Sequence, residues 1–301
     1  MIDPDILAQV RRIQIRTSRL VNDVMVGGYT SSFRGTGIEF DEVREFVEGD
    51  DPRTVDWNVT ARTGRPHIKK FMEERELTVM FLLDASASTQ FGTVPKPQAA
   101  GRRTVRDVAA EFCACMSLAA SRNNDKAGLI SFSDRVEQYV PAKKGTHHVL
   151  RLIREVLALE PEGSGTDLAE ALEYAGRVQR KRAIVFLISD FLSEGYAQSL
   201  RLLSRRHDLV AVRIRDPKTR ELPRAGLLSL RDLETGQQLL VDTSSRHVRE
   251  AHRQRMEDLD TAYAEALRRA GIDGMEIGTE QSVADPIVQF FRMRELRGAH
   301  R

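Results

Sequence analysis

The chain has 301 residues, of which 30% are charged and 41% hydrophobic, and its formal net charge is +2. This composition is typical of a globular chain with a substantial core, and the near balance of charge argues against a nucleic-acid partner. The opening residues 1–5 lack the basic and apolar regions of a signal peptide, and the apolar runs are too short to span a bilayer. We therefore expect a cytoplasmic protein without membrane insertion.

Hydrophobic spacing divides the chain into an N-terminal part and a part in which strands and helices alternate. Residues 4–26 predict an amphipathic helix, and residues 27–66 predict an extended arm with one or two small strands. Beyond them, strands are predicted at residues 77–84, 127–132, 136–140, 183–189 and 271–278, with a β-ribbon over 226–241. Helices are predicted at residues 103–122, 147–159, 167–179, 247–270 and 284–296, and two further elements at 196–206 and 208–215.

This alternation, with one Gly-rich crossover loop, predicts an α/β fold with a doubly wound, mainly parallel sheet. We expect an N-terminal helix and arm over residues 1–75, and the sheet domain with a C-terminal helical extension over residues 76–301. The arm has too little core to fold alone, and we expect Trp57, the only tryptophan, to anchor it by burying its ring.

The apolar strand that begins near Leu77 ends in an Asp-x-Ser-x-Ser turn formed by Asp84, Ser86 and Ser88. Ligands of open α/β sheets bind beyond the carboxyl ends of such strands. One carboxylate and two hydroxyls on alternate residues are hard oxygen donors, which suit Mg²⁺. The same residues also occur as ordinary turn and helix-cap residues, so the turn alone does not establish a metal site.

Two later segments offer further oxygen ligands. Thr166 lies in the Gly-rich loop that precedes a predicted helix, and Asp190 follows the strand at residues 183–189. Asp167 also lies at that helix start, where we expect it to stabilise the helix dipole and not to bind metal.

In this order the three segments resemble a von Willebrand factor A-like domain over roughly residues 76–214. The resemblance implies that Ser86, Ser88 and Thr166 coordinate Mg²⁺ or Mn²⁺ directly or through water. It also implies that Asp84 and Asp190 accept hydrogen bonds from the coordinated groups. The open position of such a metal takes a carboxylate from a partner protein.

A second set of residues, upstream of the first long strand, forms an acidic and basic motif. It comprises Gly35, Gly37, Glu39, Arg44, Gly49, Asp50, Arg53, Asp56, Trp57 and Arg62. The motif resembles the signature of a bacterial uncharacterised family that has a von Willebrand A-like domain and is associated with MoxR-type AAA+ ATPases. We interpret these residues as structural, with paired charges holding the arm.

The resemblance implies a metal-dependent protein–protein interaction module without enzyme activity, acting as an adaptor or partner of a MoxR-type AAA+ ATPase in complex assembly or activation. Two alternatives use the same residues. The first is a Mg²⁺-dependent phosphohydrolase, although the second acid usual in such sites is replaced by Ser86. The second is an RNA-binding A-like domain, which the charge balance disfavours.

Overall fold

A computed structural model of the chain describes residues 39–47, 50–72, 77–96 and 101–299. These residues form two compact units, which divide between Leu77 and Thr78. The predicted helix over residues 4–26 lies outside the described residues, as do Gly35, Gly37 and Gly49 of the N-terminal motif. The division into residues 1–75 and 76–301 stays a prediction.

The smaller unit is built on an antiparallel pair, β1 (Glu39–Glu45) with β2 (His67–Met72). Between them lie η1 (Pro52–Thr54) and α3 (Trp57–Thr63), so the prediction of an extended arm with one or two small strands missed a helix here. The helix is defined by its caps: Asp56 accepts hydrogen bonds from two backbone N–H groups of the first turn, and Gly64 ends the helix in a left-handed conformation, φ 71°.

Two residues of the N-terminal motif, Arg44 and Asp50, form an ion pair in this unit, whereas a third, Trp57, is not buried as expected. Arg44 donates two hydrogen bonds of 2.8 Å to the two carboxylate oxygens of Asp50. The expectation that Trp57 is buried was wrong, because 73% of the residue is exposed. Trp57 is the first residue of a seven-residue helix that buries none of its side chains.

The larger unit is organised around a six-stranded sheet in the order β12-β9-β8-β3-β6-β7. All neighbouring pairs are parallel except β6 with β7, which confirms the predicted doubly wound, mainly parallel fold. The six strands are β3 (Thr78–Asp84), β6 (Lys126–Phe132), β7 (Val136–Lys143), β8 (Ile184–Ser189), β9 (Asp208–Arg215) and β12 (Asp273–Gly278).

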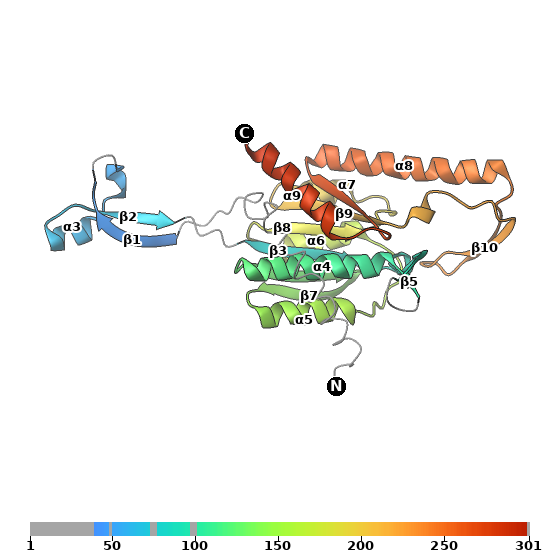
Figure 1. Cartoon of the computed structure of the whole chain (residues 1–301), viewed down its shortest axis with the longest axis horizontal. Helices are drawn as coiled ribbons and strands as arrows, with labels where there is room; N and C mark the ends of the chain where they lie inside the picture. The colour runs from blue at the N-terminus through green and yellow to red at the C-terminus, as the bar shows by residue number, and fades with distance from the viewer. Residues whose placement is uncertain (1–38, 48–49, 73–76, 97–100, 300–301) are drawn as a thin grey trace. The chain divides into compact units, whose positions relative to one another are not determined.

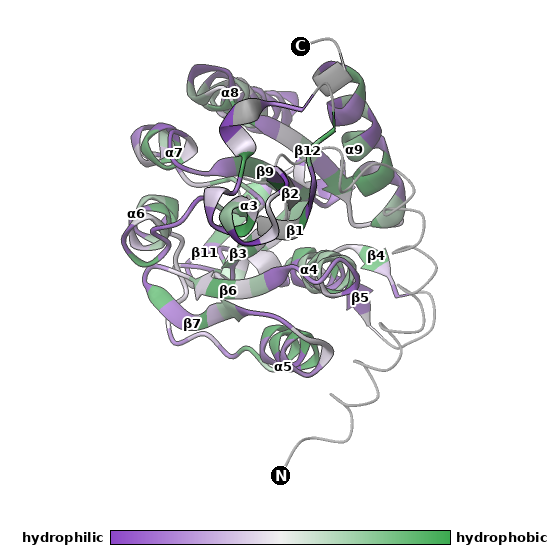
Figure 2. Cartoon of the chain, turned by 90° about the vertical axis from the view of Figure 1, so that its left-hand side faces the viewer, coloured by the Kyte–Doolittle hydropathy of each residue, from purple (hydrophilic) through white to green (hydrophobic). Residues whose placement is uncertain are grey.

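Helices cover both faces of this sheet (Figures 1 and 2). One face carries α4 (Val105–Arg122), α5 (Thr146–Leu157) and α9 (Ala284–Ala299); the other carries α6 (Leu168–Val178), α7 (Ala197–Ser204) and α8 (Arg246–Ala270). On the first face, the ring of Phe112 meets that of Phe186 edge to face at 5.4 Å. On the second, buried side chains from the sheet pack against α6, α7 and α8. Burial on both faces explains the continuous apolar runs of the central strands.

The remaining elements are short and lie mainly in the connections. They are η2 (Ala87–Gln90), β4 (Val94–Pro95), β5 (Arg102–Arg103) and η3 (Pro217–Thr219), with the predicted ribbon formed by β10 (Leu227–Arg231) and β11 (Gln238–Asp242). The ribbon is a separate two-stranded sheet. Within the described part of the chain, no helix combines the length and the apolar character needed to cross a membrane.

Candidate metal centre

The candidate site lies where the sheet changes winding direction. β3 is the first strand of the sheet in chain order, and it pairs with β6 on one side and with β8 on the other. The connections that leave β3 and β8 therefore diverge, which opens a crevice at the carboxyl ends of these strands. Asp84 is the last residue of β3, and Asp190 directly follows β8.

Asp84 is held by both strand ends and is only 1% exposed. Its Oδ1 accepts a hydrogen bond of 2.9 Å from the backbone N–H of Ser86, which turns the chain out of the strand. Its Oδ2 accepts a hydrogen bond of 2.6 Å from the hydroxyl of Ser189 on β8, and that hydroxyl oxygen accepts the N–H of Phe191 at 3.0 Å. Ser189 was not predicted as a site residue; its position directly before Asp190 was the only signal for it.

Hydroxyl groups connect the two ends of the site. The hydroxyl oxygens of Ser86 and Ser88 lie 3.0 Å apart, and Ser88 donates a hydrogen bond of 2.9 Å to Oδ2 of Asp190. The other carboxylate oxygen of Asp190 accepts the N–H of Leu192 at 3.1 Å. Four of the five predicted metal-site residues are thus joined by hydrogen bonds within one small region, although their role in binding a metal stays a prediction.

Thr166 reaches this region through the loop that precedes α6. The backbone N–H of Ala87 donates to the carbonyl of Ser164 at 2.9 Å, which fastens the loop to the Ser86–Ser88 turn. The hydroxyl of Thr166 donates a hydrogen bond of 2.7 Å to Oε1 of Glu234, in the turn of the β10–β11 ribbon. Asp167 accepts the N–H of Glu170 at 2.9 Å and caps α6; that it does not bind metal stays a prediction.

The two aspartates of the site oppose one another electrostatically. Burial, reinforced by the nearby charge of Asp190, raises the pKa of Asp84. Burial also raises the pKa of Asp190, against hydrogen bonds from Ser88 and Leu192 and the charge of Arg213. Arg213 donates to the backbone carbonyl of Asp190 at 3.2 Å, and its guanidinium also pairs with Asp260 at 2.8 Å. A cation placed between two such carboxylates would favour their ionised forms.

The donor set therefore fits a hard divalent cation. Hydroxyl and carboxylate oxygens are the ligands that Mg²⁺ and Mn²⁺ prefer. Within the described ranges, no group of three or more His, Cys, Asp or Glu side chains is placed so that it could hold a metal ion. The candidate site differs because hydroxyls contribute much of its oxygen, and two carboxylates contribute the charge.

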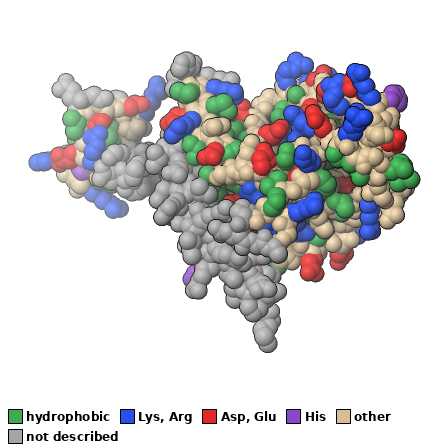
Figure 3. Space-filling view, turned by 45° about the vertical axis from the view of Figure 1, so that its right-hand side comes forward, with side chains coloured by type: hydrophobic (Ala, Val, Ile, Leu, Met, Phe, Trp, Pro, Cys, Tyr) green, Lys and Arg blue, Asp and Glu red, His purple; other side chains and the backbone are tan. Residues whose placement is uncertain are grey.

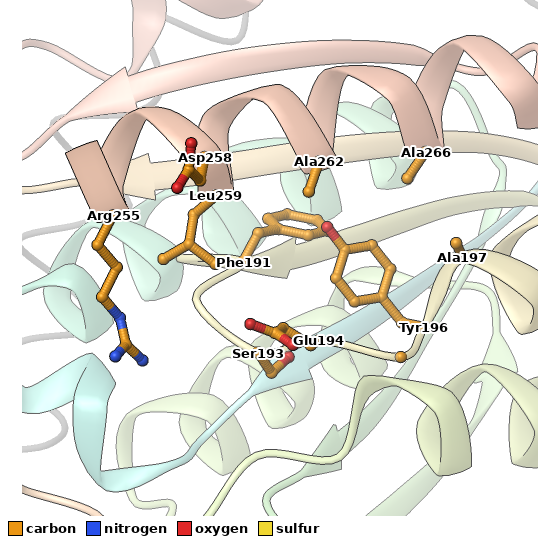
Figure 4. A pocket seen from close by; sticks show the side chains of 11 residues that line it. Phe191, Ser193, Glu194, Tyr196, Ala197, Arg255, Asp258, Leu259, Ala262 and Ala266 are labelled. Carbon is orange, nitrogen blue, oxygen red and sulfur yellow. The ribbon is translucent and has the colours of Figure 1, made fainter.

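The site opens into a cavity of about 470 Å³, which is lined by Ser88 and Asp190 together with Leu233, His252 and Met256. A second cavity, of about 580 Å³, adjoins α8 (Figure 4). In it, the rings of Phe191 and Tyr196 lie beneath α8, with their centroids 5.8 Å apart. The candidate site thus faces a hollow large enough to receive side chains of another segment.

A doubly wound sheet of this order, with Asp-x-Ser-x-Ser at the end of its central strand, defines a von Willebrand A-like domain. Residues 42–262 match the family model described as "Protein of unknown function DUF58", and the chain belongs to this family. It is 30% identical over 306 aligned positions to the uncharacterized protein Rv1480 of Mycobacterium tuberculosis, covering 99% of this chain and 92% of that protein.

Two solved structures are partially similar to this chain. The conserved hypothetical protein BatB of Bacteroides thetaiotaomicron is 17% identical, with 75% of this chain and 100% of that chain covered and a TM-score of 0.44. Proximal thread matrix protein 1 of the mussel byssus, with a zinc-occupied MIDAS motif, is 15% identical, with 46% and 38% covered and a TM-score of 0.35. The fold assignment of this chain rests on its own strand order.

Proposed function

We propose that the larger unit is a metal-dependent protein-interaction module that binds a carboxylate of a partner protein through Mg²⁺ or Mn²⁺. Ser86, Ser88 and Thr166 would hold the ion, and Asp84 and Asp190 would orient them. The observation that carries the proposal is the burial of Asp84 and Asp190 at the switch point of the sheet, with the hydroxyl of Ser88 donating to Asp190. When bound, the ion would supply a Lewis-acidic position for an incoming oxygen.

The residues of the chain suit binding more than catalysis. Neutral hydroxyl ligands leave much of the charge of a divalent ion uncompensated, so an external carboxylate gains most from binding there. A phosphohydrolase would need Asp84 to reach its substrate. Both oxygens of Asp84 are instead engaged by Ser86 and Ser189, and the residue is 1% exposed.

The finer parts of the proposal rest on the resemblance of the sequence to its family. They are that the partner is a MoxR-type AAA+ ATPase or a client protein, that the chain has no enzyme activity, and that it works in the cytoplasm. The resemblance also supports an adaptor role in assembling or activating another complex.

Mn²⁺ titration of the full chain, followed by electron paramagnetic resonance, tests the metal site. We expect one Mn²⁺ to bind to the wild type, and the affinity to fall at least tenfold in Asp84→Asn. Asp167→Asn is a matched control: it removes the same charge beside the same site, and asparagine still caps a helix. Equal binding by wild type and Asp84→Asn would refute the proposal. Pull-down of a MoxR-type ATPase that is insensitive to EDTA would refute the metal-bridged contact.

A further inference from the structure

The turn between β10 and β11 has a defined shape that directs one side chain toward the metal site. Oδ1 of Asp232 accepts the N–H groups of Glu234 and Thr235 at 2.9 and 3.1 Å, and Gly236 closes the turn with a φ of 73°. At the base of the ribbon, the buried Thr243 donates to the carbonyl of Gly226 at 2.7 Å. These hydrogen bonds fix the hairpin at its turn and at its base, and so they define the position of Glu234 in the turn.

Glu234 contacts the loop and the turn that form the candidate metal site. Its carbonyl accepts the hydroxyl of Ser164 at 2.9 Å, and its Oε1 accepts the hydroxyl of Thr166 at 2.7 Å. Glu234 also lines the same cavity as Ser88 and Asp190. Its carboxylate therefore lies beside the candidate metal site, in the place where a partner carboxylate is expected.

We propose that Glu234 is a built-in carboxylate ligand of this site, supplied by the β10–β11 turn, which closes the open metal position until a partner displaces it. The proposal rests on the metal-binding function proposed above. A carboxylate has two oxygens, so one can keep the hydrogen bond from Thr166 while the other faces the ion. With Glu234 bound, the ion gains an anionic ligand without any second protein.

The ribbon has the features of an element that can leave the site. It pairs with no strand of the main sheet. Five of its six leucines are exposed, the exception being the half-buried Leu228: Leu227 66%, Leu230 38%, Leu233 41%, Leu239 66% and Leu240 68%. Figure 3 shows hydrophobic side chains at the right-hand end of the larger unit, the end at which Figure 1 places β10. An element that buries so little apolar surface is weakly attached, so its position depends on polar contacts such as those of Glu234.

The experiment compares wild type, Glu234→Gln and Glu221→Gln, with Mn²⁺ and acetate as probes. Glu221 is exposed and lies outside the ribbon. Its substitution therefore removes the same charge without changing the turn that carries Glu234. Water-proton relaxation reports the number of exchangeable waters on bound Mn²⁺. We expect about one more water in Glu234→Gln than in the other two proteins, because an octahedral ion replaces a lost ligand by water. Acetate should remove that water in Glu234→Gln and leave the wild type unchanged.

Hydrogen exchange gives an independent result. Mg²⁺ should slow exchange in residues 232–237 of the wild type and of Glu221→Gln, but not of Glu234→Gln. Mn²⁺ binding that depends on Asp84, with the same number of waters and the same hydrogen exchange in all three proteins, would refute the role of Glu234 and leave the proposed metal site standing. If no protein binds Mn²⁺ at all, the proposed metal-dependent function fails, and this inference with it.

Discussion

The hydroxyl of Ser189 on β8 donates a hydrogen bond of 2.6 Å to Oδ2 of Asp84 on β3, so the neighbouring ends of two strands are joined by one side-chain contact. This contact keeps Asp84 fixed beside Asp190 without any metal. The cost is electrostatic, because two acidic groups are buried close together and the pKa of each is raised.

We expect Asp84→Asn to increase the stability of the metal-free protein at neutral pH. For an acid with a raised pKa the folded state holds the proton more tightly, so stability is fully present below the ordinary pKa near 3.8 and falls as the pH rises through the folded pKa. The variant removes that dependence. Thermal unfolding in EDTA between pH 4 and pH 8 should show a smaller fall for Asp84→Asn, whereas Mg²⁺ should raise the unfolding temperature of the wild type alone. Identical pH profiles would contradict this account.

Two glycines of the Thr166 loop provide a matched test of how the loop is placed. A Cβ at Gly163 would lie 2.1 Å from Oδ1 of Asp134 and 2.3 Å from the hydroxyl of Ser133, whereas a Cβ at Gly165 would meet its nearest atom at 3.5 Å. We expect Gly163→Ala to displace the loop, weakening Mn²⁺ binding severalfold, and Gly165→Ala to bind Mn²⁺ as the wild type does. Calorimetric titration of both variants measures this. An effect of equal size in both would show that the loop position is unimportant.

The ion pair between Arg213 and Asp260 should control acid stability. Burial would raise the pKa of Asp260, but hydrogen bonding to Arg215 and the charges of Arg213 and Arg215 lower it to about 2. Its contribution is therefore complete above the ordinary pKa near 3.8 and is lost as the pH falls toward 2. Arg213 is 2% exposed, so it depends on this partner and on the ring of Tyr263, 4.6 Å from its guanidinium carbon.

We expect Asp260→Asn to destabilise the protein by about 1.5–3 kcal/mol at pH 7, a value typical of a lost hydrogen bond to a charged group. Chemical denaturation at pH 7 and pH 3 checks this, with the difference between the two proteins shrinking at the lower pH. A difference that is independent of pH would assign the effect to packing and not to charge.

In the smaller unit, Asp56→Ala should loosen α3. The substitution removes the acceptor for the N–H groups of Asn58 and Val59, which typically costs about 1 kcal/mol. Hydrogen exchange of residues 58–63 should become faster, while exchange in the sheet of the larger unit stays unchanged. Asp56→Asn is the control, because asparagine caps equally well. If hydrogen exchange in Asp56→Asn were as fast as in Asp56→Ala, the charge of Asp56 and not its cap would stabilise the helix.

How far the sequence predicts this molecule depends on how local the relevant interactions are. The central strands β3, β6 and β8 are buried on both faces and form continuous apolar runs, which is why their positions, and that of the Asp-x-Ser-x-Ser turn after Leu83, could be predicted. Helix α3 was missed because its caps, Asp56 and Gly64, flank a polar segment with no buried face. Glu234 was missed because it lies 68 residues beyond Thr166, and nothing in a turn sequence reveals what lies across from it.

Because Glu234 belongs to the same chain as the site it contacts, any partner must compete with a tethered rival. A tethered group acts at an effective concentration on the order of millimolar. A free carboxylate with the same intrinsic affinity for the ion cannot displace it below that concentration. A successful partner must add further contacts, for which Leu192 and Met256 in the adjoining cavity offer apolar surface. The turn thereby sets a minimum affinity that a partner must exceed to bind the ion. Discrimination between partners then depends on the contacts around the incoming carboxylate.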